Sequence, residues 1–184
     1  MPEFLNGVEQ GGGGASSGGL TTVADVTVTG GAVTEFGDTI TLVDGGVYEF
    51  TATCIQNGAG ASDCAWLFDS DQTASNYQTD RILSAQSGAP VAVQANSTFY
   101  SITAGASDAA NETLVGGIVI RVVATALHCQ FLSTRPYESV ASSGRYQIGA
   151  MVYDSGTLPT QIGVLSSLAS GIANGSTIKG VRLY

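Results

Sequence analysis

The sequence predicts an all-β protein: a jelly-roll-like β-sandwich that follows a flexible, glycine-rich N-terminal arm. Three observations lead to this prediction. Apolar and polar residues alternate with a period of two in short segments from Leu20 onward, which is the pattern of half-buried strands. Turn signals rich in Gly, Asn, Asp and Ser recur about every 8 to 12 residues, as in sandwiches and barrels. No long segment combines helical periodicity with helix caps, and 184 residues suffice for one domain with one core.

The first 19 residues differ in composition from the rest of the chain. The stretch "MPEFL" has an apolar tip, and "GGGGASSGG" has the composition of a flexible linker. The sequence therefore predicts an arm, residues 1–19, and a sandwich domain, residues 20–184. Phe4 and Leu5 are suited to docking into a groove on a partner. A tail without a structural role, or a cloning remnant, is the alternative.

The first expected strands show the clearest alternation. Residues 21–30 carry Ala or Val at every second position from Ala24 and polar residues between them. Residues 38–43 follow, and the tripeptide "DGG" after them is a hairpin-type turn. Residues 47–56 alternate again and place Tyr48, Phe50, Ala52 and Cys54 on one face.

Shorter strands are expected in the middle of the chain, at residues 63–69, 79–85, 90–95 and 97–103. The stretch 113–131 is too rich in Val, Ile and Thr to favour a helix. Its Gly116 and Gly117 predict a bulge or bend within a central strand.

The last expected strands are residues 145–153, 161–172 and 176–184, although the stretch 157–171 is also compatible with one short helix. The final strand runs to Tyr184. Chain ends fray unless they are held, so this strand is expected to be hydrogen-bonded into a sheet. These segments amount to roughly ten to twelve strands, for which the two-sheet jelly roll is the favoured arrangement.

Charge and composition argue against two classes of partner. The formal net charge is −9, and the six cationic residues are scattered: Arg81, Arg121, Arg135, Arg145, Lys179 and Arg182. A nucleic-acid-binding protein neutralises about 6 to 10 phosphates, so every cation would have to converge on one face. No apolar run approaches the roughly 20 residues that span a bilayer. The N-terminus also lacks the pattern of a secretory signal, so we expect a protein made in the cytoplasm of a host cell and released by a route such as lysis.

Three cysteines, Cys54, Cys64 and Cys129, cannot all pair within one chain. Cys54 and Cys64 flank the turn-like "NGAGAS" and could form a disulfide across a hairpin. The preferred interpretation is three small buried thiols that fill space in the core.

Residues for catalysis are few. His128 is the only histidine, and its neighbour Cys129 is expected on the opposite face of the same strand, so the two cannot form a dyad. Carboxylates for glycoside cleavage would have to come from Glu49, Asp63, Asp69, Asp80 and Glu138, with nothing to bring two of them together. We expect no enzyme activity and no cofactor.

The loop "DSDQTASN" offers oxygen ligands from Asp69, Asp71, Thr73 and Asn76, which calcium would accept. It lacks the spacing of an EF-hand loop. The favoured interpretation is a polar loop in which Asp and Ser side chains cap backbone amides, with no metal.

Aromatic residues exceed the needs of an aliphatic core. If exposed, rings such as Trp66 and Tyr77 could stack against a sugar. The alternative is that most of these rings line the interior of the sandwich.

Two stretches resemble the decoration and appendage domains of tailed phages. In "AWLFDSDQTASNYQTDRI" a hydrophobic strand precedes a polar loop that ends in Asn76 and Tyr77. In "LASGIANGSTIKGVRLY" the segment Gly175 to Ile178 opens a closing strand that ends in Leu183 and Tyr184.

The resemblance implies a jelly-roll structural protein of the virion, similar to cement or head-fibre proteins. Such a protein would be a homotrimer that binds the major capsid protein or other virion proteins through protein contacts, with Phe4 and Leu5 of the arm touching the capsid or a neighbouring subunit. The alternative is a carbohydrate- or receptor-binding jelly-roll module of a phage fibre, in which Trp66 and Tyr77 would stack on the ligand.

Overall fold

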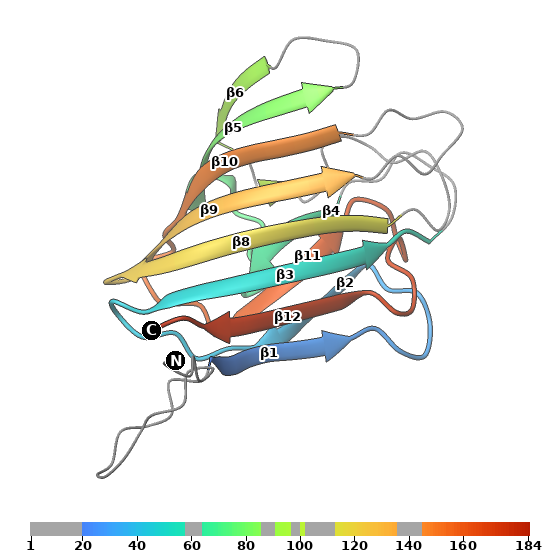
Figure 1. Cartoon of the computed structure of the whole chain (residues 1–184), viewed down its shortest axis with the longest axis horizontal. Helices are drawn as coiled ribbons and strands as arrows, with labels where there is room; N and C mark the ends of the chain where they lie inside the picture. Colours follow the sequence, from blue (N-terminus) through green and yellow to red (C-terminus); the bar gives the residue numbers. More distant parts are fainter. Residues whose placement is uncertain (1–19, 58–63, 86–90, 97–99, 102–112, 136–144) are drawn as a thin grey trace, which may run out of the picture.

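We describe residues 20–57, 64–85, 91–96, 100–101, 113–135 and 145–184 of a computed structural model of the chain. Nearly all regular structure in these residues is β-strand (Figure 1). The strands are β1 Thr21–Thr27, β2 Glu35–Thr39, β3 Val47–Ile55, β4 Cys64–Phe68, β5 Tyr77–Ala85, β6 Val91–Asn96, β7 Tyr100–Ser101, β8 Thr113–Val123, β9 Ala126–Arg135, β10 Arg145–Tyr153, β11 Gln161–Ser166 and β12 Thr177–Arg182, with one 3₁₀ turn, η1, at Ala74–Asn76. The prediction of an all-β fold is confirmed.

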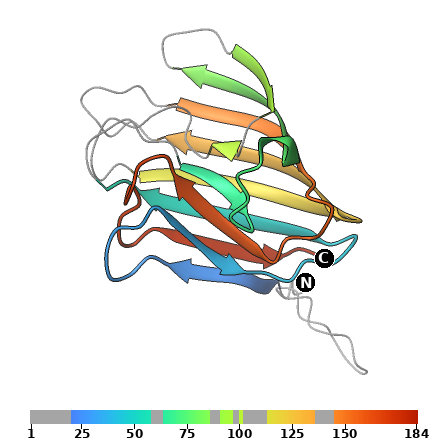
Figure 2. The same ribbon diagram turned by 180° about the vertical axis from the view of Figure 1, so that it is seen from behind.

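The strands form two antiparallel sheets packed face to face. The large sheet has the order β1-β12-β3-β8-β9-β10-β5-β6, and the small sheet has the order β2-β11-β4-β7. In Figure 1 the large sheet lies in front; Figure 2 shows the small sheet from its own side, with β5 and β6 extending the large sheet beyond it.

The connections are those of a jelly roll. Of the eight strands that form the jelly roll, β1, β3, β8 and β12 lie in the large sheet and β2, β4, β7 and β11 in the small sheet. Successive members of this set lie in opposite sheets except β4 and β7, which are neighbours in the small sheet. These eight strands give two facing four-stranded sheets, β1-β12-β3-β8 and β2-β11-β4-β7, as in the double Greek key of jelly rolls. The pairs β5-β6 and β9-β10 add four strands to the β8 edge of the large sheet. The jelly-roll-like sandwich predicted from the sequence is therefore present.

Three expected elements differ in detail. The second strand is β2, Glu35–Thr39, and residues 40–43 are not strand. The stretch 113–131 is not one bent strand: it contains β8 and the start of β9, joined by a tight turn at Ala124. The turn forms because Ala124 adopts a φ of 53° and its N–H donates to the Asp44 carboxylate at 2.8 Å. The stretch 157–171 contains β11 and no helix.

The core lies between the sheets and is unusually aromatic. Its largest fully buried side chains are Trp66, Tyr48, Tyr77, Tyr153, Phe50 and Phe68. These rings come from β3 in the large sheet, from β4 in the small sheet and from β5 and β10 in the extension. Aromatic side chains bury large areas each, so this core supplies much of the driving force for folding.

The C-terminal strand is held as predicted. β12 pairs with β1 on one side and with β3 on the other. Beyond β12, Leu183 N–H donates to the carbonyl of Val47 at 2.8 Å, and the carbonyl of Tyr184 accepts from Val47 N–H at 3.1 Å. Hydrogen bonding therefore continues through the last residue of the chain.

Candidate binding surface on the large sheet

The outer face of the large sheet, turned away from the small sheet, exposes large apolar side chains. Ile82 on β5, Val119 on β8, Leu132 on β9 and Ile148 on β10 are 38–51% exposed. We call these four residues the apolar band. In β8 and β10 apolar residues occupy both phases of the alternation, so that one set fills the core and the other faces outward, whereas β5 and β9 each contribute a single large apolar residue to the outer face.

Strand register gathers the band into one patch. Ile148 pairs directly with Leu132 on one side and with Ile82 on the other. Leu132 in turn pairs with Gly117 of β8, two residues from Val119. Directly opposite residues have Cβ atoms about 5 Å apart, so Ile82, Ile148 and Leu132 lie side by side across three strands.

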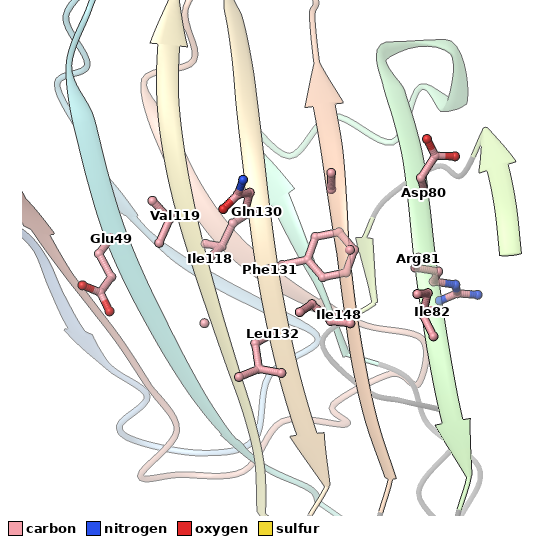
Figure 3. Close-up of a pocket in the computed structure, with 13 residues that line it drawn as sticks. Glu49, Asp80, Arg81, Ile82, Ile118, Val119, Gln130, Phe131, Leu132 and Ile148 are labelled. Carbon is pink, nitrogen blue, oxygen red and sulfur yellow. The ribbon is translucent and has the colours of Figure 1, made fainter. Parts of the chain in front are cut away.

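The band lines a groove of about 1070 Å³ (Figure 3). Gly117 hollows this face, because a Cβ built on it would meet only the carbonyl oxygen of Leu132, at 3.8 Å. Gly149 serves the opposite face of β10: a Cβ there would lie 2.4 Å from the ring of Phe131, which occupies that space. The result is a shallow, mostly apolar depression on an otherwise regular sheet.

Charged groups stand at the two ends of the groove. Glu49 comes from β3 at one end, and Asp80 and Arg81 come from β5 at the other, with the apolar side chains between them (Figure 3). Glu49 and Asp80 are separated by four strand spacings, or roughly 19 Å. Paired carboxylates in glycosidases stand about 5 to 9.5 Å apart, so these two cannot work together on one glycosidic bond.

His128 and Cys129 lie on opposite faces of β9, as the alternation predicts. His128 is exposed on the outer face, whereas Cys129 is buried in the core. Burial raises the pKa of the Cys129 thiol well above its ordinary value. The pair therefore lacks both the geometry and the thiolate of a catalytic dyad.

The loop after β4 uses its carboxylates to hold backbone. Asp69 Oδ1 accepts hydrogen bonds from the N–H groups of Thr160 and Gln161, both at 2.8 Å. Asp71 Oδ1 accepts from Thr73 N–H at 2.8 Å, which closes an Asx turn. The predicted capping of backbone amides is confirmed for the two Asp side chains, whereas Ser70 donates its hydroxyl to the carboxylate of Glu35. Within the described ranges no three metal-ligating side chains come together.

Asp71 also joins the loop to the core. Tyr77 donates its hydroxyl to the carbonyl of Asp71 at 2.9 Å, and Tyr153 donates to Asp71 Oδ2 at 3.2 Å. Burial acts to raise the pKa of Asp71, but hydrogen bonds from Asn76, Thr73 and Tyr153 outweigh it and lower the pKa. Burial raises the pKa of Tyr153 to about 12, so this phenol remains a neutral donor. The cluster is structural: it fixes the loop against β5 and β10.

Trp66 and Tyr77 do not form a sugar-binding platform. Both are completely buried, Trp66 on the inner face of β4 and Tyr77 against Phe68 and Tyr153. A ring must present one face to solvent before a sugar can stack on it, so the prediction of ligand stacking by these two residues is wrong. Tyr184 is 69% exposed, more than any other aromatic side chain whose exposure the structure describes.

The three cysteines are free and buried, as the preferred interpretation states. Cys54 lies on β3 and Cys64 on β4, so they belong to different sheets and not to one hairpin. Their thiols interact across the core: a hydrogen bond with Cys64, together with burial, raises the pKa of Cys54.

Phe4 and Leu5 lie outside the described residues, as does the whole of the arm, 1–19. The apolar band was not among the sites predicted from the sequence. A signal was available in β8 and β10, where both phases of the alternation are apolar. That pattern is typical of strands covered on both faces.

No family of known proteins, no curated protein and no solved structure matches the chain. Among the described residues there is also no helix of the length and hydropathy that crossing a membrane requires.

Proposed function

We propose that this protein is a structural protein of a phage virion, a capsid decoration or cement protein that stabilises the particle through protein contacts. The observation that supports the proposal most strongly is the apolar band on the outer face of the large sheet. An exposed apolar patch with polar ends is typical of protein interaction sites.

The form of the surface favours a protein partner over a small ligand. The apolar band is open to solvent. It lies across four neighbouring strands of the large sheet, β8, β9, β10 and β5. Small ligands are usually held in deeper pockets with several convergent polar groups. The net charge of −9 also disfavours polyanionic partners.

The proposal includes a non-enzymatic role and a homotrimer. Closed symmetry would give each copy the same contacts with the shell and with its neighbours. Attachment to a capsid then depends on contact area, for which a total of about 1,200 Å² or more is typical of stable interfaces.

Binding of purified protein to particles that lack it tests the proposal. The wild-type chain is expected to co-sediment with such particles. A variant carrying Leu132→Ser and Ile148→Ser should bind at least about ten-fold more weakly, because central apolar anchors dominate interface energy.

Val123→Ser is the matched control, because Val123 is 44% exposed on the same face of β8 but lies outside the groove. It should bind like the wild type. Wild-type protein that fails to bind particles, or a band variant that binds as tightly as the control, would contradict the proposal.

The alternative, a carbohydrate-binding module, relied on exposed rings of Trp66 and Tyr77, and both rings are buried. Any glycan site would have to use other residues, of which Tyr184 is the exposed aromatic candidate. Glycan-array binding that is lost in Tyr184→Ala would favour this alternative over a cement protein.

A further inference from the structure

We propose that in the free protein the apolar tip of the N-terminal arm, Phe4 and Leu5, docks into the groove of its own chain. The inference concerns the protein before it meets any partner and does not depend on the proposed function. This docking is supported by the point at which the arm leaves the sheet, by the length of its linker and by the size and apolar lining of the groove.

The arm leaves the large sheet nearly level with the groove. Thr21, the first residue of β1, is connected by direct pairings through β12, β3 and β8 to Cys129 of β9. The row that contains Leu132 is three residues further along β9. The displacement along the strands is therefore only about 10 Å.

The length of the linker matches the remaining distance. From β1 to β9 the sheet spans four strand spacings, or roughly 19 Å, and the displacement along the strands brings the total to about 22 Å. About 15 residues separate Leu5 from Leu20, and a glycine-rich linker of this length has a root-mean-square extension of roughly 20 Å. A tether whose extension matches the span gives the highest effective concentration, on the order of millimolar for short linkers.

The groove is large enough to hold a short apolar segment of this chain. Its volume of about 1070 Å³ is close to the upper end for pockets that hold small ligands, about 1,000 Å³. The two large apolar side chains of Phe4 and Leu5, separated from the domain by a glycine-rich linker, are of a size that such a space can hold. Their docking would cover Leu132 and Ile148, which are about half exposed.

Charge does not drive this contact. The arm carries Glu3 and Glu9, and the groove has Glu49 and Asp80 at its two ends, with Arg81 beside Asp80. Salt screens the repulsion between like charges, whereas the free energy gained by burying apolar side chains is retained. Docking is therefore expected to persist or strengthen in high salt.

Paramagnetic relaxation in the full-length, ¹⁵N-labelled protein tests the inference. A nitroxide is attached through Glu3→Cys, since the three native thiols are buried and should not react. The amide signals of Gly117, Leu132 and Ile148 are expected to lose most of their intensity. The amides of β2 and β11, in the opposite layer, should keep theirs.

Two variants examine the tip and the groove separately. Phe4→Ser with Leu5→Ser should restore the groove signals. Gly117→Val should also restore them, because it fills the hollow while remaining apolar, and the open space around Gly117 accommodates the added atoms. Val123→Ser, outside the groove, should leave the broadening unchanged.

A mixing experiment distinguishes this chain's groove from that of another copy. Spin-labelled, unenriched protein is mixed with ¹⁵N protein that carries no label, and the groove signals should remain sharp. Broadening in the mixture, uniform or absent broadening in the labelled chain, or broadening that survives Gly117→Val would each overturn the inference.

Discussion

At the scale of single residues, two glycines show how the large sheet uses missing side chains. Gly180 of β12 lies beneath Phe50, and a Cβ built on it would fall 2.3 Å from the phenyl ring. Gly117 on the outer face has open space instead. The same residue type therefore serves packing on one face and a hollow on the other.

Gly180→Ala is expected to destabilise the protein by about 1 to 3 kcal/mol, because the fully buried ring of Phe50 has no room to move. Gly117→Ala is the matched control and should change the free energy of unfolding by less than about 0.5 kcal/mol. Urea denaturation of the two variants and the wild type measures the difference. Equal effects would mean that Phe50 does not pack against Gly180.

Asp71 predicts a dependence of stability on pH. Its pKa is lowered in the folded protein, so the ionised form contributes stability that is fully present above the pKa of the unfolded chain, about 4. This contribution is lost as the pH falls through the lower, folded pKa. Stability should therefore decrease in acid partly through Asp71.

The test compares the free energy of unfolding at about pH 7 and about pH 3. Asp71→Asn should lower stability at neutral pH and lose less of it in acid than the wild type does. Asp80→Asn, on the open face of β5, is the control and should retain the wild-type dependence. If Asp71→Asn and the wild type lose the same amount in acid, the hydrogen bonds to Asp71 do not favour its ionised form.

At the scale of elements, the clearest strands were predictable because local pattern and tertiary burial agree. The expected strand at 145–153 coincides with β10, and the expected strand at 47–56 extends one residue beyond β3. β2 was misplaced because "EFGDT" contains Glu, Gly and Asp, which have low strand propensity. It becomes a strand through pairing with β11, a contact far away in sequence.

The turn between β8 and β9 was also not predicted, because its sequence carries no turn signal of its own. Hairpin turns with positive φ usually contain Gly or Asn, and this one has Ala124, whose N–H donates a hydrogen bond to the side-chain carboxylate of Asp44. Ala124→Gly should relieve the strain and stabilise the protein by up to about 1 kcal/mol. Ala126→Gly, within β9, should instead destabilise it by about 0.5 to 1 kcal/mol. Thermal unfolding of both variants checks the opposite signs.

The three buried thiols are expected to react slowly with alkylating reagents. Cys54 and Cys129 have raised pKa values and all three thiols are buried, so alkylation at about pH 8 should be slow in the native protein and complete after unfolding. Mass spectrometry after a timed pulse of iodoacetamide counts the modified cysteines. Rapid modification of the native protein would show that the sandwich opens between these sheets.

At the scale of the whole molecule, the sequence could predict a two-layer β protein but not which strands become neighbours. The pairing of β12 between β1 and β3, and of β11 between β2 and β4, joins the end of the chain to its beginning. The candidate surface depends on such register: Ile82 and Ile148 are far apart in sequence and directly opposite in the sheet. Trp66 and Tyr77 illustrate the converse, because their ring chemistry was visible in the sequence whereas their burial was not.

We propose that this protein contacts its protein partners through the outer face of the large sheet, and the proposed role places those partners in a virion. Electron cryomicroscopy of intact particles tests it most directly, since the sandwich can be oriented in a map by its two unequal sheets. Copies of the domain are expected to lie on the particle with Leu132 and Ile148 against a neighbouring protein. Particles without the domain, or a domain whose large sheet faces solvent on every copy, would contradict it.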